Sequence, residues 1–204
     1  GSRYDSWFYT AYRRIRDGAI GDVRLLDGRK SYKLGSREAF YRSRDTYGGT
    51  LPWVGIHAFD WINWVTEGDA ESVHARHSAR QNRDHGDLET SATASLEFED
   101  EVLATVNVDY YRPEAAPTHG DDRLRVVGTD GVIEVRNGNV YLINDEADGE
   151  RRLPQDDPGS FFDDYLSMLA GDGECLVDAA ESFRATEISL TAREAADRET
   201  TLSL

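Results

Sequence analysis

The middle of the chain is a series of short segments with the alternating or β-branched pattern of strands. The predicted strands are residues 71–80, 89–99, 101–111, 123–128, 131–136 and 139–143. Turn signals such as Asp130-Gly131 and Asn137-Gly138 connect them closely. Because parallel strands need a longer crossover, short turns predict a largely antiparallel sheet. The chain is therefore limited to folds built around such a sheet.

Helix signals flank this region on both sides. On the N-terminal side the sequence predicts a helix over 4–16, a strand over 23–34, an irregular segment over 35–46 and a helix over 52–67. On the C-terminal side it predicts helices over 160–170 and 178–197 and a last strand over 200–204. This order predicts an α+β fold, with a large open, mostly antiparallel sheet and helices packed on one face.

We expect residues 3–204 to form a single domain, because a chain of 204 residues fits one hydrophobic core, which can grow to about 250 residues. Gly1 and Ser2 resemble the remnant of a cleaved expression tag, so the natural protein is expected to begin earlier. The acidic segment 144–157 is the one we expect to be most mobile.

The charge of the chain restricts its partners. Its 39 acidic and 23 basic residues give a net charge of −16, which repels phosphate backbones and anionic membranes. We therefore expect no nucleic acid and no membrane partner. A single cysteine, Cys175, excludes an internal disulfide and favours a cytoplasmic location. The dispersed acids and the presence of only two lysines are typical of proteins from salt-loving organisms.

Several common functional motifs are missing from the sequence. It contains no G-x-G-x-x-G, P-loop, G-x-S-x-G or paired cysteines, so the chain has no dinucleotide fingerprint of its own. His74 and His77 lie three residues apart on a predicted strand and should point to opposite faces. We therefore expect no metal site from these residues and His85.

The predicted helix 52–67 is apolar nearly all round and should be largely buried. Its polar exceptions, His57, Asp60 and Asn63, follow one another at i+3 spacing, which allows Asp60 to face His57. Two interpretations stay open. Either His57 and Asp60 are buried in the core and hydrogen-bond to each other, or His57 is the reactive group of a site and Asp60 orients its ring.

Residues 47–60, YGGTLPWVGIHAFD, resemble the G-G-G-x-L-x-D-x-G-x-H-x-x-D signature of the Gfo/Idh/MocA oxidoreductases. The resemblance continues in the same order along the chain. RRIRDGAIGDV at 13–23 is similar to the segment that leads into the family's first sheet strand, and RVVGTDGVI at 125–133 is similar to a family hairpin. Arg42 matches an arginine that precedes the glycines, and 161–197 resembles the two closing helices.

The resemblance implies the C-terminal, dihydrodipicolinate-reductase-like domain of such an enzyme, without the N-terminal Rossmann domain. The full-length protein would then use NAD or NADP on a CH–OH group of a sugar or cyclic polyol. His57 falls on the family histidine and would take the hydroxyl proton. We expect this chain alone to bind no cofactor and to be inactive.

One position departs from the signature, because Trp53 stands where the family usually has an aspartate. Tryptophan accepts no proton, although its face can stack on a sugar. Asp60 or Asp45 could replace the missing acid, the chemistry could rely on a lysine of the absent domain and His57, or this member is not an ordinary polyol dehydrogenase. We favour the second of these.

Three arginines precede the glycine pair and could hold a substrate carboxylate. For Arg37 and Arg44 we expect salt pairing with acids of the chain instead. Arg42 is the better candidate for binding substrate, because it matches an arginine of the family. The alternative to the enzyme is a non-catalytic ligand-binding or oligomerisation module of the same fold. In either case the sheet face without helices should associate with other copies, because a broad sheet needs cover there.

Overall fold

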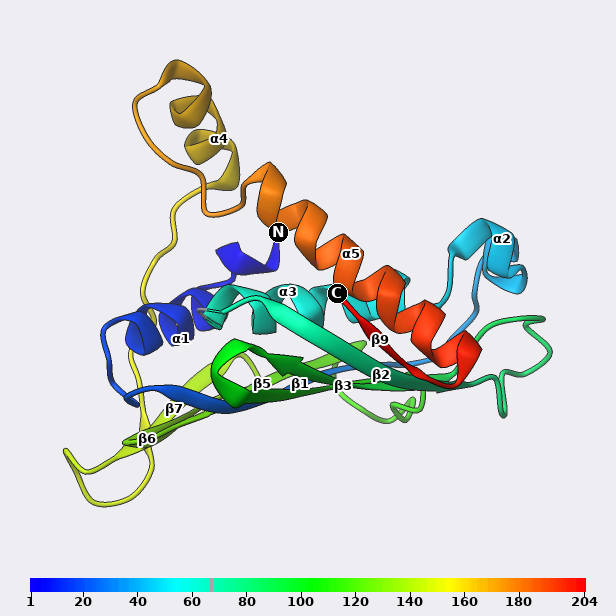
Figure 1. The fold of residues 1–204 in the computed structure, drawn as a ribbon, viewed down its shortest axis with the longest axis horizontal. Helices are drawn as coiled ribbons and strands as arrows, with labels where there is room; N and C mark the ends of the chain where they lie inside the picture. The colour runs from blue at the N-terminus through cyan, green and yellow to red at the C-terminus, as the bar shows by residue number, and fades with distance from the viewer. Residues whose placement is uncertain (67) are drawn as a thin grey trace.

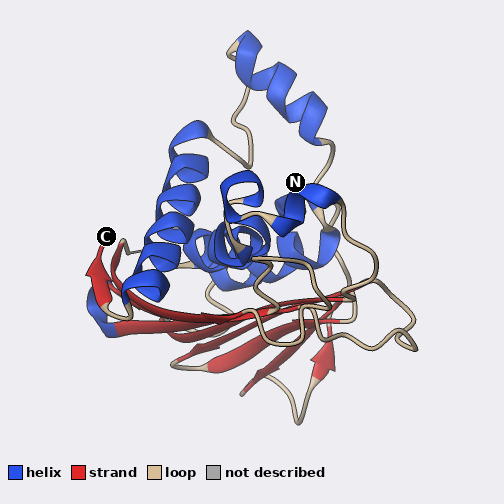
Figure 2. Cartoon of the chain, turned by 90° about the vertical axis from the view of Figure 1, so that its right-hand side faces the viewer, coloured by secondary structure: helices blue, strands red, loops and turns tan. Residues whose placement is uncertain are grey.

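The computed structural model describes residues 1–66 and 68–204, and its centre is one nine-stranded sheet. The strands are β1 (Val23–Tyr32), β2 (Ala70–Ser78), β3 (Ser91–Phe98), β4 (Val102–Asp109), β5 (Gly120–Gly128), β6 (Gly131–Arg136), β7 (Asn139–Asn144), β8 (Arg151–Arg152) and β9 (Thr201–Ser203). Their order across the sheet is β8-β7-β6-β5-β1-β4-β3-β2-β9. The helices gather over one face of this sheet (Figures 1 and 2). The predicted α+β class and the one covered face are confirmed.

The helices are α1 (Ser6–Arg16), α2 (Arg44–Tyr47), α3 (Ile56–Val65), α4 (Phe161–Ala170) and α5 (Ala179–Arg198). The helix expected over 52–67 begins earlier, with a wide π turn over Leu51–Gly55, and α3 ends at Val65. Residue 67 of that prediction lies outside the described residues. The segment 35–46, expected to be irregular, contains a 3-10 turn and the start of α2, and 144–157 contains β8. None of the described helices is long and apolar enough to cross a membrane.

The sheet is mixed at one place. β1 pairs in parallel with β4 and antiparallel with β5, whereas every other neighbouring pair is antiparallel. β4 and β5 follow each other in the chain but lie on opposite sides of β1. The connection over 110–119 is long enough to pass the end of β1, so these two strands do not form a hairpin. The sheet is thus mostly antiparallel, as predicted, with one parallel pair.

The core lies between the sheet and α3, whose position is set by a close approach to β1. Trp61 and Ile62 of α3 are 0% exposed. A Cβ at Gly28 would lie 3.1 Å from Ile62 Cδ1 and 3.3 Å from the Cβ of Ala58. Glycine at this point of β1 therefore lets the helix lie directly on the strand. This contact fixes the first turn of α3, which carries His57.

Candidate active site

A pocket of about 270 Å³ opens beside the first turn of α3. It is lined by Tyr32, Arg37, Tyr41, Trp53, Val54, His57, Tyr110 and His119. Tyr32 is the last residue of β1, and Tyr110 directly follows β4. The pocket therefore lies at the C-terminal ends of the central strands β1 and β4, next to the π turn and α3.

His57 is exposed toward this pocket, although α3 is otherwise mostly buried. Partial burial of the ring and the nearby Lys30 ammonium lower the pKa of His57 below its usual value. The carboxylates of Asp122 and Asp60 act in the opposite direction and do not outweigh them. The imidazole is therefore neutral at pH 7, the form in which a histidine can accept a proton.

Asp60 does not pair with His57 as the i+3 spacing predicted. Its carboxylate accepts hydrogen bonds from both Nε and Nη2 of the Arg3 guanidinium, the shortest at 2.7 Å, and no hydrogen bond joins it to His57 within the described chain. Arg3 is fully buried and also pairs with Glu181 at 2.6 Å. The guanidinium needs two carboxylates because its burial is costly. The prediction of a His57–Asp60 pair is wrong, since Asp60 stabilises Arg3.

Tyr41 and Trp53 form an aromatic wall that lines the same pocket as His57. Trp53 is 44% exposed, and its Nε1–H donates to the Tyr41 hydroxyl at 3.0 Å. The only polar donor of Trp53 is thus occupied, and the free part of this side chain is its flat face. The structure places Trp53 in the same pocket as His57, one helical turn before it.

Two further hydrogen-bonding residues line the pocket: Arg37, one of the three arginines considered from the sequence, and Tyr110, which the sequence did not single out. Tyr110 is buried, and its hydroxyl has no hydrogen-bond partner among residues 1–66 and 68–204. Burial raises the pKa of Tyr110, although the Arg37 guanidinium opposes the shift, so the phenol stays protonated. Arg37 lies over the Tyr110 ring at 4.6 Å and donates to the Lys33 carbonyl at 2.7 Å. The expected acid partner of Arg37 is not found in the described structure.

Arg42 and Asp45 lie outside this pocket. Both are exposed, Arg42 at the end of its 3-10 turn and Asp45 in the first turn of α2. Neither they nor Asp60 are among the residues that line the pocket around His57. Their proposed contacts with a substrate stay predictions.

A buried ion pair lies beside His57 on β1 and β5. Lys30 is 5% exposed, and its Nζ donates to Asp122 at 2.6 Å. The same ammonium lies 5.0 Å from the centre of the Trp61 ring. This pair was not predicted, because its members stand ninety-two positions apart in the chain. It supplies the charges of both signs that act on His57.

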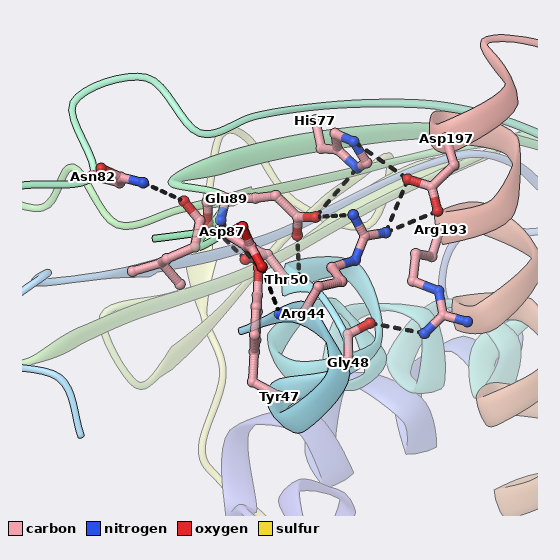
Figure 3. Close-up of polar contacts among 11 residues, drawn as sticks. Arg44, Tyr47, Gly48, Thr50, His77, Asn82, Asp87, Glu89, Arg193 and Asp197 are labelled. Carbon is pink, nitrogen blue, oxygen red and sulfur yellow. Dashed lines mark hydrogen bonds and ion pairs between the residues drawn. The ribbon is translucent and has the colours of Figure 1, made fainter. Parts of the chain in front are cut away.

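A second polar network holds the start of the π turn (Figure 3). Glu89 is 4% exposed, and its carboxylate accepts from the Thr50 backbone N–H at 2.6 Å. The same carboxylate pairs with Arg44 at 2.6 Å, and Arg44 also pairs with Asp197 of α5 at 2.9 Å. The predicted salt pairing of Arg44 is confirmed. The network ties α2 and α5 to the segment that carries Trp53 and His57.

The fold is shared with solved oxidoreductase structures. A family model described as the GFO/IDH/MocA C-terminal domain matches residues 8–134, and the chain belongs to this family. A Thermotoga maritima protein assigned as an oxidoreductase is 46% identical, with a TM-score of 0.96, over 100% of this chain and 62% of that chain.

More distant structures share the fold alone. The aldose-aldose oxidoreductase of Caulobacter crescentus, complexed with glycerol, is 20% identical with a TM-score of 0.84, over 100% of this chain and 62% of its own. A levoglucosan dehydrogenase, in complex with NADH and L-sorbose, is 16% identical with a TM-score of 0.81, over 98% and 63%. This chain thus spans less than two thirds of each of these structures. No curated protein sequence matches it.

Proposed function

We propose that residues 3–204 are the substrate-binding domain of an NAD(P)-dependent oxidoreductase that acts on a CH–OH group of a sugar or cyclic polyol. The observation that carries this proposal is the neutral His57 in a pocket with an aromatic wall and an unpaired Tyr110 hydroxyl. Aromatic faces suit the C–H surface of a sugar, and the phenol can hydrogen-bond its hydroxyl groups. The names of two structural relatives, which refer to sugars, support the same substrate class.

In this proposal His57 takes the proton of the substrate hydroxyl as a general base. Tyr110, Arg37 and Trp53 line the same pocket. In the proposal, Tyr110 and Arg37 bind other oxygens of the substrate, and Trp53 stacks on its ring. The described residues of this chain do not fit a dinucleotide, because β1 is followed by the 3-10 turn rather than by a glycine-rich turn into a helix. We therefore assign NAD or NADP to the part of the full-length protein outside this chain and propose that the chain alone is inactive.

A panel assay of the full-length protein tests this function. We expect reduction of NAD or NADP with at least one aldose or cyclic polyol, and no reduction when residues 3–204 are assayed alone. A full-length protein that binds NAD or NADP but turns over no member of the panel would contradict the proposal. Turnover of simple alcohols in preference to every sugar would contradict the substrate class.

A non-catalytic sugar-binding module is the second candidate, and Trp53 favours it. An indole that occupies the usual place of an acid gives binding surface without proton transfer. Calorimetry separates the two candidates. Sugar binding by a full-length protein without turnover would support the module, whereas binding with turnover would support the enzyme.

We also propose that the sheet face without helices forms a homo-oligomer interface. Leu25 on β1, its β4 neighbour Leu103 and Ile143 on β7 are 44%, 49% and 46% exposed there. We expect sedimentation in molar KCl to show an oligomer that Leu103→Asp dissociates. A strict monomer at high salt would contradict this interface.

The composition supports two further proposals about the source of the protein. The net charge of −16 supports a salt-loving organism, and an unfolding temperature that does not rise between low and molar KCl would contradict this origin. The free Cys175 supports a cytoplasmic location. Recovery of the protein outside the cytoplasm on cell fractionation would contradict that location.

A further inference from the structure

Helix α4 stands away from the sheet and from the other helices, at the end of two loops (Figures 1 and 2). None of its ten residues is buried. Phe162, Leu166 and Leu169 follow at i, i+4 and i+7, so they form one stripe, and they are 63%, 46% and 64% exposed. An exposed apolar stripe of this kind marks an interaction site.

The helix itself is well defined by its sequence. The Ser160 side chain accepts from the backbone N–H of Asp163, and Gly171 ends the helix in the left-handed conformation. The stripe is therefore a fixed feature of a helix about 15 Å long at 1.5 Å per residue. A helix of this length with an apolar stripe and no buried residue gains stability from packing against a partner.

The first residues of the chain lie at the base of this helix. The Tyr4 hydroxyl donates to Asp164 at 2.8 Å, and the Tyr4 ring meets Phe161 edge-on at 5.5 Å. Arg3 donates to the carbonyl of Leu176, in the loop that follows α4, at 3.0 Å. A polypeptide that continues before residue 1 would therefore start beside α4. Arg3 also pairs with Asp60 at 2.7 Å, three residues after His57 on α3, which places the same entry point near the helix that carries His57.

We propose that the stripe of Phe162, Leu166 and Leu169 is the docking surface for the domain that precedes residue 1 in the full-length protein. The matching family model is a C-terminal domain, and the Thermotoga maritima structure extends well beyond the 62% that this chain covers. A preceding domain seated on α4 would lie next to the entry point and close to the His57 pocket. The inference rests on the proposed function only because that function assumes a preceding domain. It does not depend on the reaction that the full-length protein catalyses.

Hydrogen–deuterium exchange of α4 tests this surface. We expect the backbone amides of 162–170 to exchange at least tenfold more slowly in the full-length protein than in residues 1–204 alone. Equal exchange in both proteins would overturn the proposal. Slow exchange in residues 1–204 that depends on protein concentration would also overturn it, because a second copy would then cover the stripe.

Glutamate substitutions in the stripe test the same surface by hydrogen–deuterium exchange. Phe162→Glu with Leu169→Glu should restore fast exchange of α4 in the full-length protein, whereas the control Leu103→Glu, on the opposite side of the molecule, should not. Circular dichroism of residues 1–204 with the same double substitution shows whether α4 itself persists. Retained slow exchange in the double variant would overturn the proposal. Exchange is measured without substrate, so a full-length protein that protects α4 but oxidises no sugar would keep the docking surface and reject the enzyme.

Discussion

Replacing His57 by alanine in the full-length protein is expected to lower kcat on the best sugar or polyol by about 10²- to 10⁴-fold, the range for loss of a general base. The reason is that, apart from His119, the other groups that line the pocket cannot take up the proton in its place. Tyr110 is a protonated phenol, Arg37 is a permanent cation, and Trp53 accepts no proton. His57→Gln should show a similar loss, because the amide keeps a hydrogen bond but takes no proton near neutral pH. His85→Ala, outside the pocket, is the control.

The pH profile of kcat gives a second readout for His57. Since burial and Lys30 lower the pKa of His57, the base stays neutral as the pH falls below the ordinary histidine value of about 6.5. Activity should therefore persist at pH 6.5 and decline only as the pH falls through the lowered pKa. Loss of half the activity above pH 7, or unchanged turnover in His57→Ala, would remove His57 from this role.

Local sequence patterns were sufficient for most of the fold. Alternation along 91–98 and 102–109 places one set of side chains on the covered face, and turn signals join neighbouring strands. The same patterns predicted β1 as a strand but not its position in the sheet, because the local sequence of a strand does not indicate which strands it will pair with. Its place between β4 and β5 depends on register over the whole sheet.

For the candidate site, too, local sequence predicted some features, and only the tertiary fold shows the others. The apolar pattern of 52–67 was enough to place His57 on a largely buried helix with Trp53 one turn before it, whereas the π turn that precedes α3 was not predicted. Asp60 was assigned to the wrong partner because i+3 spacing compares neighbours on one helix, whereas Arg3 reaches it from 57 positions away. Tyr110 follows a strand, and only the tertiary fold shows that it lines the pocket and that its buried hydroxyl has no partner among the described residues.

Replacing Glu89 by alanine is expected to lower the free energy of unfolding of this chain by about 3–5 kcal/mol, the cost of removing one partner from a buried ion pair. The carboxylate is the acceptor for the Thr50 N–H at 2.6 Å, and Thr50 is 0% exposed. Without Glu89 that donor is unpaired inside the protein, and Arg44 keeps only Asp197. Figure 3 shows how both contacts converge on this one side chain.

Urea unfolding followed by circular dichroism measures this loss, with Glu187→Ala as the matched control. Glu187 pairs with Arg184 at 2.8 Å on the surface of α5, where its side chain is 57% exposed, so its removal should cost no more than about 1 kcal/mol. Glu89→Gln should fall between the two, because the amide oxygen can still accept from Thr50 while the charge pairing is lost. If Glu89→Ala unfolds at the same urea concentration as Glu187→Ala, the network does not hold the π turn. The packing of α3 on β1 alone would then fix the positions of Trp53 and His57.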